Sequence, residues 1–395
     1  MMQKPLAAAI STKRAPVSRA AYAEIGGGSP IMKWTNAQAS GLETQLSSKG
    51  IKGAKCYVAM RYWHPFTDEA LSEMQKDGIN ALVVLPLYPH YSVSTSGSSL
   101  GELQKAFEKN IQDWSFRKVV HTVVPHWYKR PGYIESISTL ALRELEKYSP
   151  AERAEGVKVL FSAHGVPKSY VEAGDPYKRH IEECTSLVAQ SLEKKIKASG
   201  MNGKIACELS FQSRVGPVEW LRPYTDDKIR DMGEAGVKNL VVVPVSFVSE
   251  HIETLEEIDM EYKELAEECG IQHWERVPAL NTEPKFMEDM ADMVIEAMAA
   301  PRVSIAETLA TAKAPVGKRP GKVQVPRRTP APVPQREKEE SFGKQLAKLP
   351  RISQNVQAGS LLSLMFIVDG VGRQLMSDSP SPMLNAMMMM QQLFT

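Results

Sequence analysis

The chain has 395 residues, of which 43% are hydrophobic and 24% are charged, and this is ordinary globular composition. At roughly 100–200 residues per domain, its length predicts two domains with additional segments. A formal net charge of +2 does not favour nucleic acid or an acidic polymer as a partner, and no apolar run of about 18 residues predicts a transmembrane helix.

The N-terminal residues 1–7 have too short an apolar stretch for a secretory signal and do not form a convincing transit peptide. Four cysteines are scattered along the chain without a CxxC pair, which favours a reducing compartment. Two of them, Cys56 and Cys207, lie in strand-like runs and are predicted to be small core residues.

Short β-branched runs alternate with longer amphipathic segments, a pattern typical of βα units and a parallel sheet. In the first half, strands are predicted at 55–61, 81–87 and 121–125, and helices at 67–77 and 99–109, the first of which opens with a Thr67-Asp68 cap.

In the second half, strands are predicted at 157–163, 205–211, 239–247 and 274–279, with helices near 175–198, 226–235, 254–269 and 284–298. The second half thus has four strand units and the first only three. If the halves share a fold, one opening βα unit is missing before residue 1.

The expected fold class is therefore α/β, with two domains that each contain a parallel sheet flanked by helices. The domains are predicted at 1–150 and 151–300, followed by a low-complexity extension. Residues 301–350 are rich in Pro, Ala, Lys and Arg and predict a flexible basic linker. In the tail, 351–395, the apolar run Leu361–Val368 has two open interpretations: an amphipathic helix at a membrane surface or partner, or a poorly ordered segment.

One predicted strand ends at His164, and Gly165 and Pro167 then turn the chain. In open α/β sheets, ligands bind at the carboxyl ends of strands, where a histidine can accept or deliver a proton near neutral pH. The alternative is a histidine whose hydrogen bonds are satisfied by the backbone of a tight turn.

Another predicted strand runs into Ser249–Asp259, a polar segment that opens a helix. Its carboxylates lie roughly on one side of that helix: Glu250, Glu253, Glu257 and Glu261. A favourable charge at the helix N-terminus and a solvated acidic face are the alternative explanations. Because these carboxylates begin beside His251, they also offer ligands to a divalent cation, and together with His164 they favour a functional site.

Aromatic, hydroxyl and arginine side chains follow other strand ends, in residues 61–65, 88–92, 94–99 and 211–220. Aromatic rings suit the faces of a flat ligand, and arginine and hydroxyl groups suit its carboxylates. Each segment taken alone is compatible with ordinary loop packing.

Seven segments in this order resemble ferrochelatase, and in detail its plant and algal plastid type. They are Ile25–Pro30, Arg61–Pro65, Tyr88–Ser92, Ser162–Pro167, Gly174–Tyr177, Gln212–Pro217 and Ser249–Asp259. The resemblance extends from about Leu6 to Met298 and implies two Rossmann-like domains of the class II chelatase type, with a porphyrin cleft between them. The family's opening strand and its Gly-Gly-Pro turn have no counterpart here.

The resemblance implies that the chain inserts Fe²⁺ into protoporphyrin IX, the terminal step of haem synthesis. His164 and Glu253 would face each other across the metal position, with His251 orienting Glu253. Glu250, Glu257 and Glu261 would form an acidic route for iron or protons. Which of His164 and Glu253 handles protons and which the metal stays open. The residues implied to contact or position the porphyrin are Arg14, Tyr22, Ser29, Arg61, Tyr62, Tyr91, Ser213 and Trp220.

By the same resemblance, iron is a substrate and no cofactor is expected. No cysteine follows Cys269, so no iron–sulfur cluster is predicted. The expected partners are protoporphyrin IX and Fe²⁺, not nucleic acid, with peripheral membrane association as a further hypothesis and either a monomer or a homodimer. A plastid location is expected, with the mitochondrion as the alternative.

Three other functions were weighed. One is a chelatase for another metal or tetrapyrrole, and a second is a catalytically impaired porphyrin- or haem-binding protein on a chelatase fold. The third, a nucleotide- or sugar-binding protein, is disfavoured because Gly26-Gly27-Gly28 follows no predicted strand.

Overall fold

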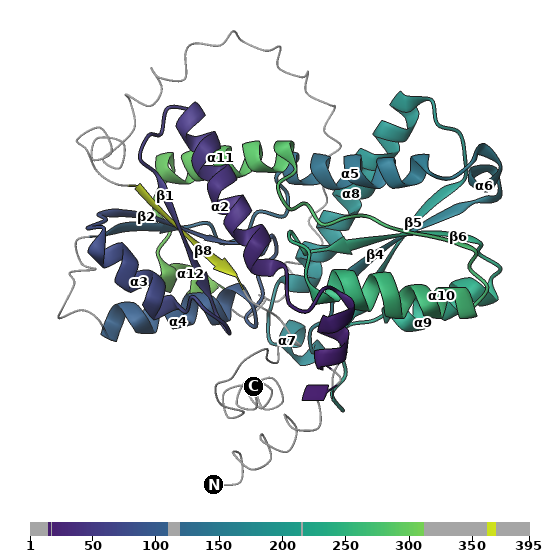
Figure 1. The fold of residues 1–395 in the computed structure, drawn as a ribbon, viewed down its shortest axis with the longest axis horizontal. Helices are drawn as coiled ribbons and strands as arrows, with labels where there is room; N and C mark the ends of the chain where they lie inside the picture. The colour runs from purple at the N-terminus through teal and green to yellow at the C-terminus, as the bar shows by residue number, and fades with distance from the viewer. Residues whose placement is uncertain (1–14, 17, 110–118, 215, 312–361, 369–395) are drawn as a thin grey trace, which may run out of the picture.

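The computed structural model describes residues 15–16, 18–109, 119–214, 216–311 and 362–368 (Figure 1). Its strands form two parallel sheets, with the orders β1-β8-β2-β3 and β5-β4-β6-β7. Their bounds are β1 Lys55–Met60, β2 Ala81–Pro86, β3 Val120–Val123, β4 Val157–His164, β5 Ile205–Gln212, β6 Asn239–Val245, β7 His273–Arg276 and β8 Leu362–Val368.

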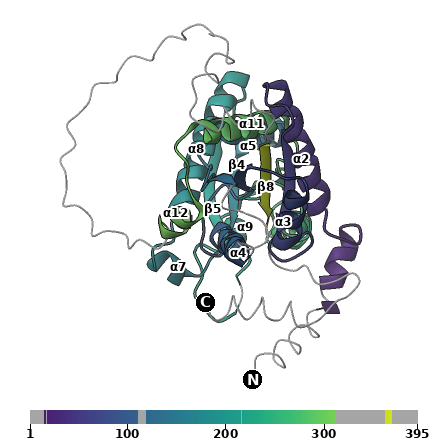
Figure 2. The same ribbon diagram turned by 90° about the vertical axis from the view of Figure 1, so that its left-hand side faces the viewer.

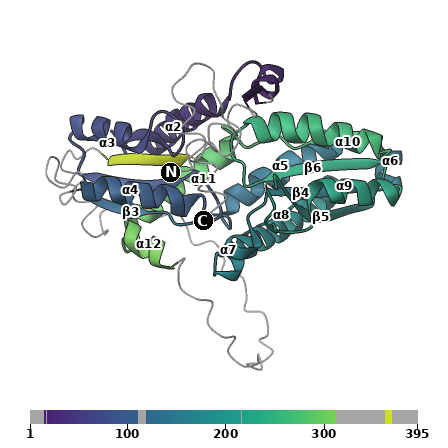
Figure 3. The same cartoon turned by 90° about the horizontal axis from the view of Figure 1, so that it is seen from below.

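Helices cover both faces of each sheet. On the first sheet, α3, α4 and α12 pack on one face and α2 and α11 on the other, and Figure 3 is viewed from the side of α3 and α4. The helix bounds are α2 Ile31–Ser48, α3 Thr67–Lys76, α4 Ser96–Lys109, α5 Pro131–Glu146, α6 Pro150–Glu155, α7 Lys168–Glu172, α8 Tyr177–Ser199, α9 Thr225–Glu234, α10 Lys263–Glu268, α11 Pro284–Ala299 and α12 Ile305–Thr311. A π-helix, η2, spans Glu253–Tyr262.

The predicted α/β class is confirmed, and the strands predicted within residues 55–279 are all present. Strands β2 and β6 are buried along their whole length, which explains their near-continuous apolar sequence, since helices cover both faces of the sheet. The predicted helix cap was wrong by one residue, because α3 begins at Thr67 and the Glu69 carboxylate accepts the N–H of Phe66 at 2.6 Å.

Three further predictions were wrong. Residues 362–368 form strand β8, not an amphipathic helix, and β8 pairs with β1 and β2 inside the first sheet. Part of the predicted linker, Ile305–Thr311, is the helix α12. Cys207 is exposed rather than in the core, because it lies on the edge strand β5. No helix of the described residues is long and apolar enough to cross a membrane.

The helices do not follow the predicted division at residue 150. Helix α5 precedes that point but packs against α8 and β6 of the second sheet, whereas α11, near the end of the second half, packs against α2, β2 and β3. In Figure 1, α2, α11, α5 and α8 form one layer along the same side of both sheets, a layer that Figure 2 shows from the end. One large apolar core therefore runs beneath this layer across both halves.

An ion pair between Arg130 and Asp289, both largely buried, joins the start of α5 to α11. Just before α5, Arg130 donates from Nη2 and Nε to Oδ1 of Asp289 at 2.7 and 3.1 Å. The other carboxylate oxygen accepts the N–H of Tyr133. The helices approach closely here, because a Cβ atom at Gly132 would clash with the Asp289 side chain.

We expect Asp289→Ala to lower the free energy of unfolding by about 3 kcal/mol, because it leaves Arg130 without its main partner where α5 meets α11. Urea unfolding followed by circular dichroism would measure this loss. The control is Glu288→Ala on the same helix, which breaks only the exposed pair with Lys285 and should cost less than about 1 kcal/mol. Equal losses in the two variants would contradict the role given to Asp289.

Candidate active site

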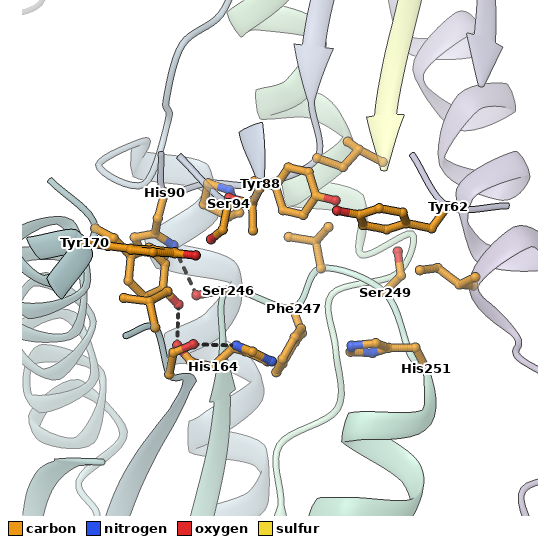
Figure 4. A pocket seen from close by; sticks show the side chains of 18 of the residues that line it. Tyr62, Tyr88, His90, Ser94, His164, Tyr170, Ser246, Phe247, Ser249 and His251 are labelled. Carbon is orange, nitrogen blue, oxygen red and sulfur yellow. Dashed lines mark hydrogen bonds between the residues drawn. The ribbon is translucent and has the colours of Figure 1, made fainter. Parts of the chain in front are cut away.

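A pocket lies where the carboxyl ends of the two sheets face each other (Figure 4). Segments that follow β1, β2, β4 and β6 line it, as expected for ligand sites of open α/β sheets. The side chains labelled around it are Tyr62, Tyr88, His90, Ser94, His164, Tyr170, Ser246, Phe247, Ser249 and His251. The walls are largely aromatic and apolar, with imidazoles and hydroxyls among them.

His164 is the last residue of β4 and lies in this pocket. Its Nδ1 atom is 2.7 Å from the carbonyl oxygen of Gly165. A carbonyl only accepts, so Nδ1 carries a hydrogen, and Nε2 is the nitrogen that can take up a further proton. The neighbouring glycine is required, because a Cβ atom at Gly165 would lie 2.9 Å from the Gln212 carbonyl oxygen and 3.2 Å from the Trp220 ring.

Glu253 and His251 form a buried ion pair beside the pocket. Their Oε2 and Nε2 atoms are 3.0 Å apart, and both side chains are less than 10% exposed. Burial by itself raises the pKa of Glu253, but the charge and hydrogen bond of His251 together with the charge of His164 lower it, and the net pKa is lowered. Burial lowers the pKa of His251, and the Glu253 carboxylate reverses this and raises it. The pair therefore holds a carboxylate ionised in a water-poor site.

Glu257 lies next along η2 and is also buried. It accepts hydrogen bonds from Ser213 Oγ at 2.8 Å and from Tyr262 Oη at 2.9 Å. Burial and the charge of Glu253 raise its pKa, so this carboxyl holds a proton more readily than its neighbour. Glu261, one step further, is exposed, so the three carboxyls run from the buried site to the surface.

Glu250 does not belong to this row, contrary to the prediction. Its carboxylate is held by Arg276 Nη1 at 3.0 Å, by Thr254 Oγ1 at 2.5 Å and by the N–H of Ala279 at 2.9 Å. These bonds tie the start of η2 to the segment after β7. Glu250 precedes the π-helix, and its role in the fold is to anchor that helix.

Of the predicted porphyrin contacts, Tyr62 and Trp220 line the pocket, and Ser213 reaches it indirectly through Glu257. Tyr22 packs against Ile252, between His251 and Glu253. Arg14 lies outside the described residues.

Three of the predicted contacts point elsewhere. Arg61 is directed at α4, where its Nε donates to Ser98 Oγ at 3.3 Å. Tyr91 is buried in the core of the first sheet, and burial with the nearby Asp175 charge raises its pKa to about 12. Ser29 accepts from the N–H of Ile31 at the start of α2.

The predicted porphyrin contacts did not include several pocket residues, chiefly Tyr88, His90, Tyr170, Tyr177 and Phe247, although residues 88–92 were predicted as a segment that suits a flat ligand. Tyr88, His90 and Phe247 directly follow buried strands, so their positions carried the same signal as that of His164. Tyr170 and Tyr177 lie on α7 and α8 and gave no such signal. The hydroxyl of Tyr177 donates to the His164 carbonyl at 2.8 Å and so fixes the strand end.

Asp175 joins the two halves beside the pocket. Its Oδ2 accepts from Ser92 Oγ and from the N–H of Val93, both at 2.8 Å, and its Oδ1 accepts the N–H of Tyr177 at 2.9 Å. A carboxylate with three such donors fixes the loop after β2 against the start of α8. Among the described residues, no group of three or more His, Cys, Asp or Glu side chains is arranged to hold a metal ion.

The family model for ferrochelatase matches residues 1–298. Ferrochelatase-2, chloroplastic, from Oryza sativa subsp. indica is 56% identical over 298 residues, which cover 75% of this chain and 54% of the relative. The protein of the same name from Arabidopsis thaliana is 53% identical, with 75% and 56% covered. Ferrochelatase from Synechocystis sp. is 50% identical, with 75% and 73% covered. The chain thus spans about half the length of its plant relatives.

We expect the His251–Glu253 pair to stabilise the metal-free protein most between about pH 4.5 and 6.5, the ordinary pKa values of Glu and His. Its contribution falls as pH drops through the lowered pKa of Glu253 and as pH rises through the raised pKa of His251. A double-mutant cycle of His251→Gln and Glu253→Gln in urea, repeated across pH, would measure a coupling of about 1–3 kcal/mol in that window. A coupling that does not vary with pH would contradict an ion pair.

Proposed function

The chain belongs to the ferrochelatase family, and on this premise we propose that it inserts Fe²⁺ into protoporphyrin IX to form protohaem with release of two protons. One observation carries the proposal: His164 and His251 line the same aromatic-walled pocket, and Glu253 is paired with His251 beside it. Iron and porphyrin are the substrates.

The chemistry requires two protons to leave the pyrrole nitrogens as the metal enters. Nε2 of His164 is free to accept the first, because Nδ1 is held by the Gly165 carbonyl. Glu253, kept ionised by His251, takes the second proton or the metal. Both assignments for Glu253 use the same property, an unprotonated carboxylate in a buried site.

Glu257 and Glu261 continue from this site toward solvent and would carry protons away or bring iron in. The raised pKa of Glu257 suits a group that receives a proton from Glu253, and Glu261 is exposed. Glu250 is left out of this route because Arg276, Thr254 and Ala279 occupy its oxygens.

The walls of the pocket suit a flat apolar macrocycle. Tyr62 and Tyr88 come from the first half, and Phe247 and Trp220 from the second. A ligand held between two rigid sheets can be bent by binding energy gained at its periphery, and bending brings pyrrole lone pairs toward the arriving metal.

We also propose a plastid location, because the rice and Arabidopsis relatives carry the word chloroplastic in their names. No resident cofactor is proposed.

We expect His164→Ala to lower the rate of metal insertion by about 10²–10⁴-fold, the range for loss of a general base. Insertion of Fe²⁺, and of Zn²⁺ as an air-stable substitute, is followed by the loss of protoporphyrin fluorescence. The matched control is His64→Ala, since His64 is exposed and pairs with Glu69 away from the pocket.

Other outcomes of this assay would replace the proposal. Porphyrin binding without insertion of any metal would indicate a catalytically impaired binding protein. Faster insertion of cobalt, or turnover of another tetrapyrrole only, would indicate a chelatase of different specificity. Equal rates for the wild type and His164→Ala would remove His164 from the mechanism.

A further inference from the structure

Strand β8 comes from the far end of the chain, yet it occupies the centre of the first sheet (Figure 1). Six of its residues pair with β1, Lys55 to Met60 against Ser363 to Val368. Six pair with β2, Ala81 to Pro86 against Leu362 to Ile367. Among the described strands, β1 and β2 do not pair with each other, and both pair with β8.

The second sheet shows what this central position normally holds. Its order, β5-β4-β6-β7, matches β1-β8-β2-β3 strand for strand, and the place of β8 corresponds to that of β4. Strand β4 is the first strand of its sheet along the chain and ends at His164, whereas β8 follows its neighbour β1 by about three hundred residues. In the first sheet, the position between β1 and β2 is thus occupied by a strand that does not belong to the consecutive βα units of residues 55–123.

An empty central place would be costly. All six residues of β2 are buried, so without a neighbour their backbone N–H and C=O groups on that side would lie unpaired in an apolar interior. A missing strand would also leave β1 and β2 about 10 Å apart, twice the usual spacing of about 4.8 Å. Neither strand could pair with the other unless the helices on both faces also moved.

We propose that the place between β1 and β2 is a strand-docking site whose occupant is residues 362–368 of the same chain, and that this docking sets the spacing of the two pocket walls that follow β1 and β2. Strand β1 leads to Tyr62, and β2 leads to Leu87 and Tyr88. Figure 4 shows β8 in yellow, pointing toward the pocket between the labelled Tyr62 and Tyr88.

The length of the intervening chain favours docking within one molecule. Residues 312–361 separate α12 from β8, and α12 packs on β3 and α4 of the same sheet. Fifty residues are enough to connect the two elements, since a chain can span up to about 3.3–3.6 Å per residue. A segment that is covalently attached to the same chain meets the site without a bimolecular step, which favours it over the segment of a second copy.

The register supplies a direct test, because the native Cys56 of β1 is paired with Leu364. Adjacent strands place paired Cα atoms at a separation that a disulfide bridges. We expect Leu364→Cys to form a disulfide with Cys56. The matched control, Ile367→Cys, is in register with Ala59 and should form none.

Both variants are made in the full chain with the exposed Cys207 replaced by Ser and a protease site inserted after Pro334. Burial raises the pKa of the Cys56 thiol, so oxidation is run at alkaline pH and to completion. After cleavage, the two fragments of Leu364→Cys should stay joined on a non-reducing gel, and those of Ile367→Cys should separate. No link in Leu364→Cys, equal links in both variants, or a linked dimer before cleavage would overturn the proposal.

Amide hydrogen exchange tests the effect on the walls without relying on the proposed activity. Phe366→Pro removes a ladder N–H from a central strand, and Phe366→Ala retains it. We expect the proline variant to exchange at least 10-fold faster in β1, β2 and the segments at Tyr62 and Leu87, with β4 and β6 unchanged. Unchanged exchange in β1 and β2 would overturn the proposal, and protection retained in the second sheet would show that the variant is folded.

Discussion

Helices α5 and α11 pack closely against each other and hold the two sheets together. Each helix belongs by sequence to one half and packs against the other, so a single apolar core lies under both sheets. The ion pair of Arg130 and Asp289, in which two guanidinium N–H groups donate to one carboxylate oxygen, ties the start of α5 to α11. Because the sheets share this layer, the carboxyl ends of their strands are held facing each other, and the pocket forms between them.

Within that frame, the site combines groups whose protonation is set by burial and by their neighbours. His251 keeps Glu253 ionised, whereas Glu257 beside it is shifted toward its protonated form. His164 offers a single free ring nitrogen because the turn at Gly165 occupies the other. A histidine base at the end of β4 therefore accompanies, beside the same pocket, an ionised carboxylate and a second carboxyl whose pKa is raised.

Much of this arrangement could be predicted from the sequence, and the failures have physical causes. Strand ends were found because a buried parallel strand leaves an uninterrupted apolar run before its polar terminus, as at His164. The sequence did not predict the direction in which individual side chains point. Tyr88 lines the pocket and Tyr91 turns into the core, although both belong to one segment, and Glu250 faces Arg276 rather than the neighbouring carboxylates. Direction depends on contacts with residues far away in the chain.

The sequence by itself determined the α/β class, the strand order along the chain, and the segments that hold His164 and Glu253, because these follow from local periodicity and short motifs. Two features depend on long-range packing instead: α5 and α11 each pack against the other half, and residues 362–368 form a central strand of the first sheet. A seven-residue apolar run is compatible with either a helix or a strand. In the structure this run is a strand because its backbone pairs with β1 on one side and β2 on the other, and no local pattern in the sequence records such long-range pairing.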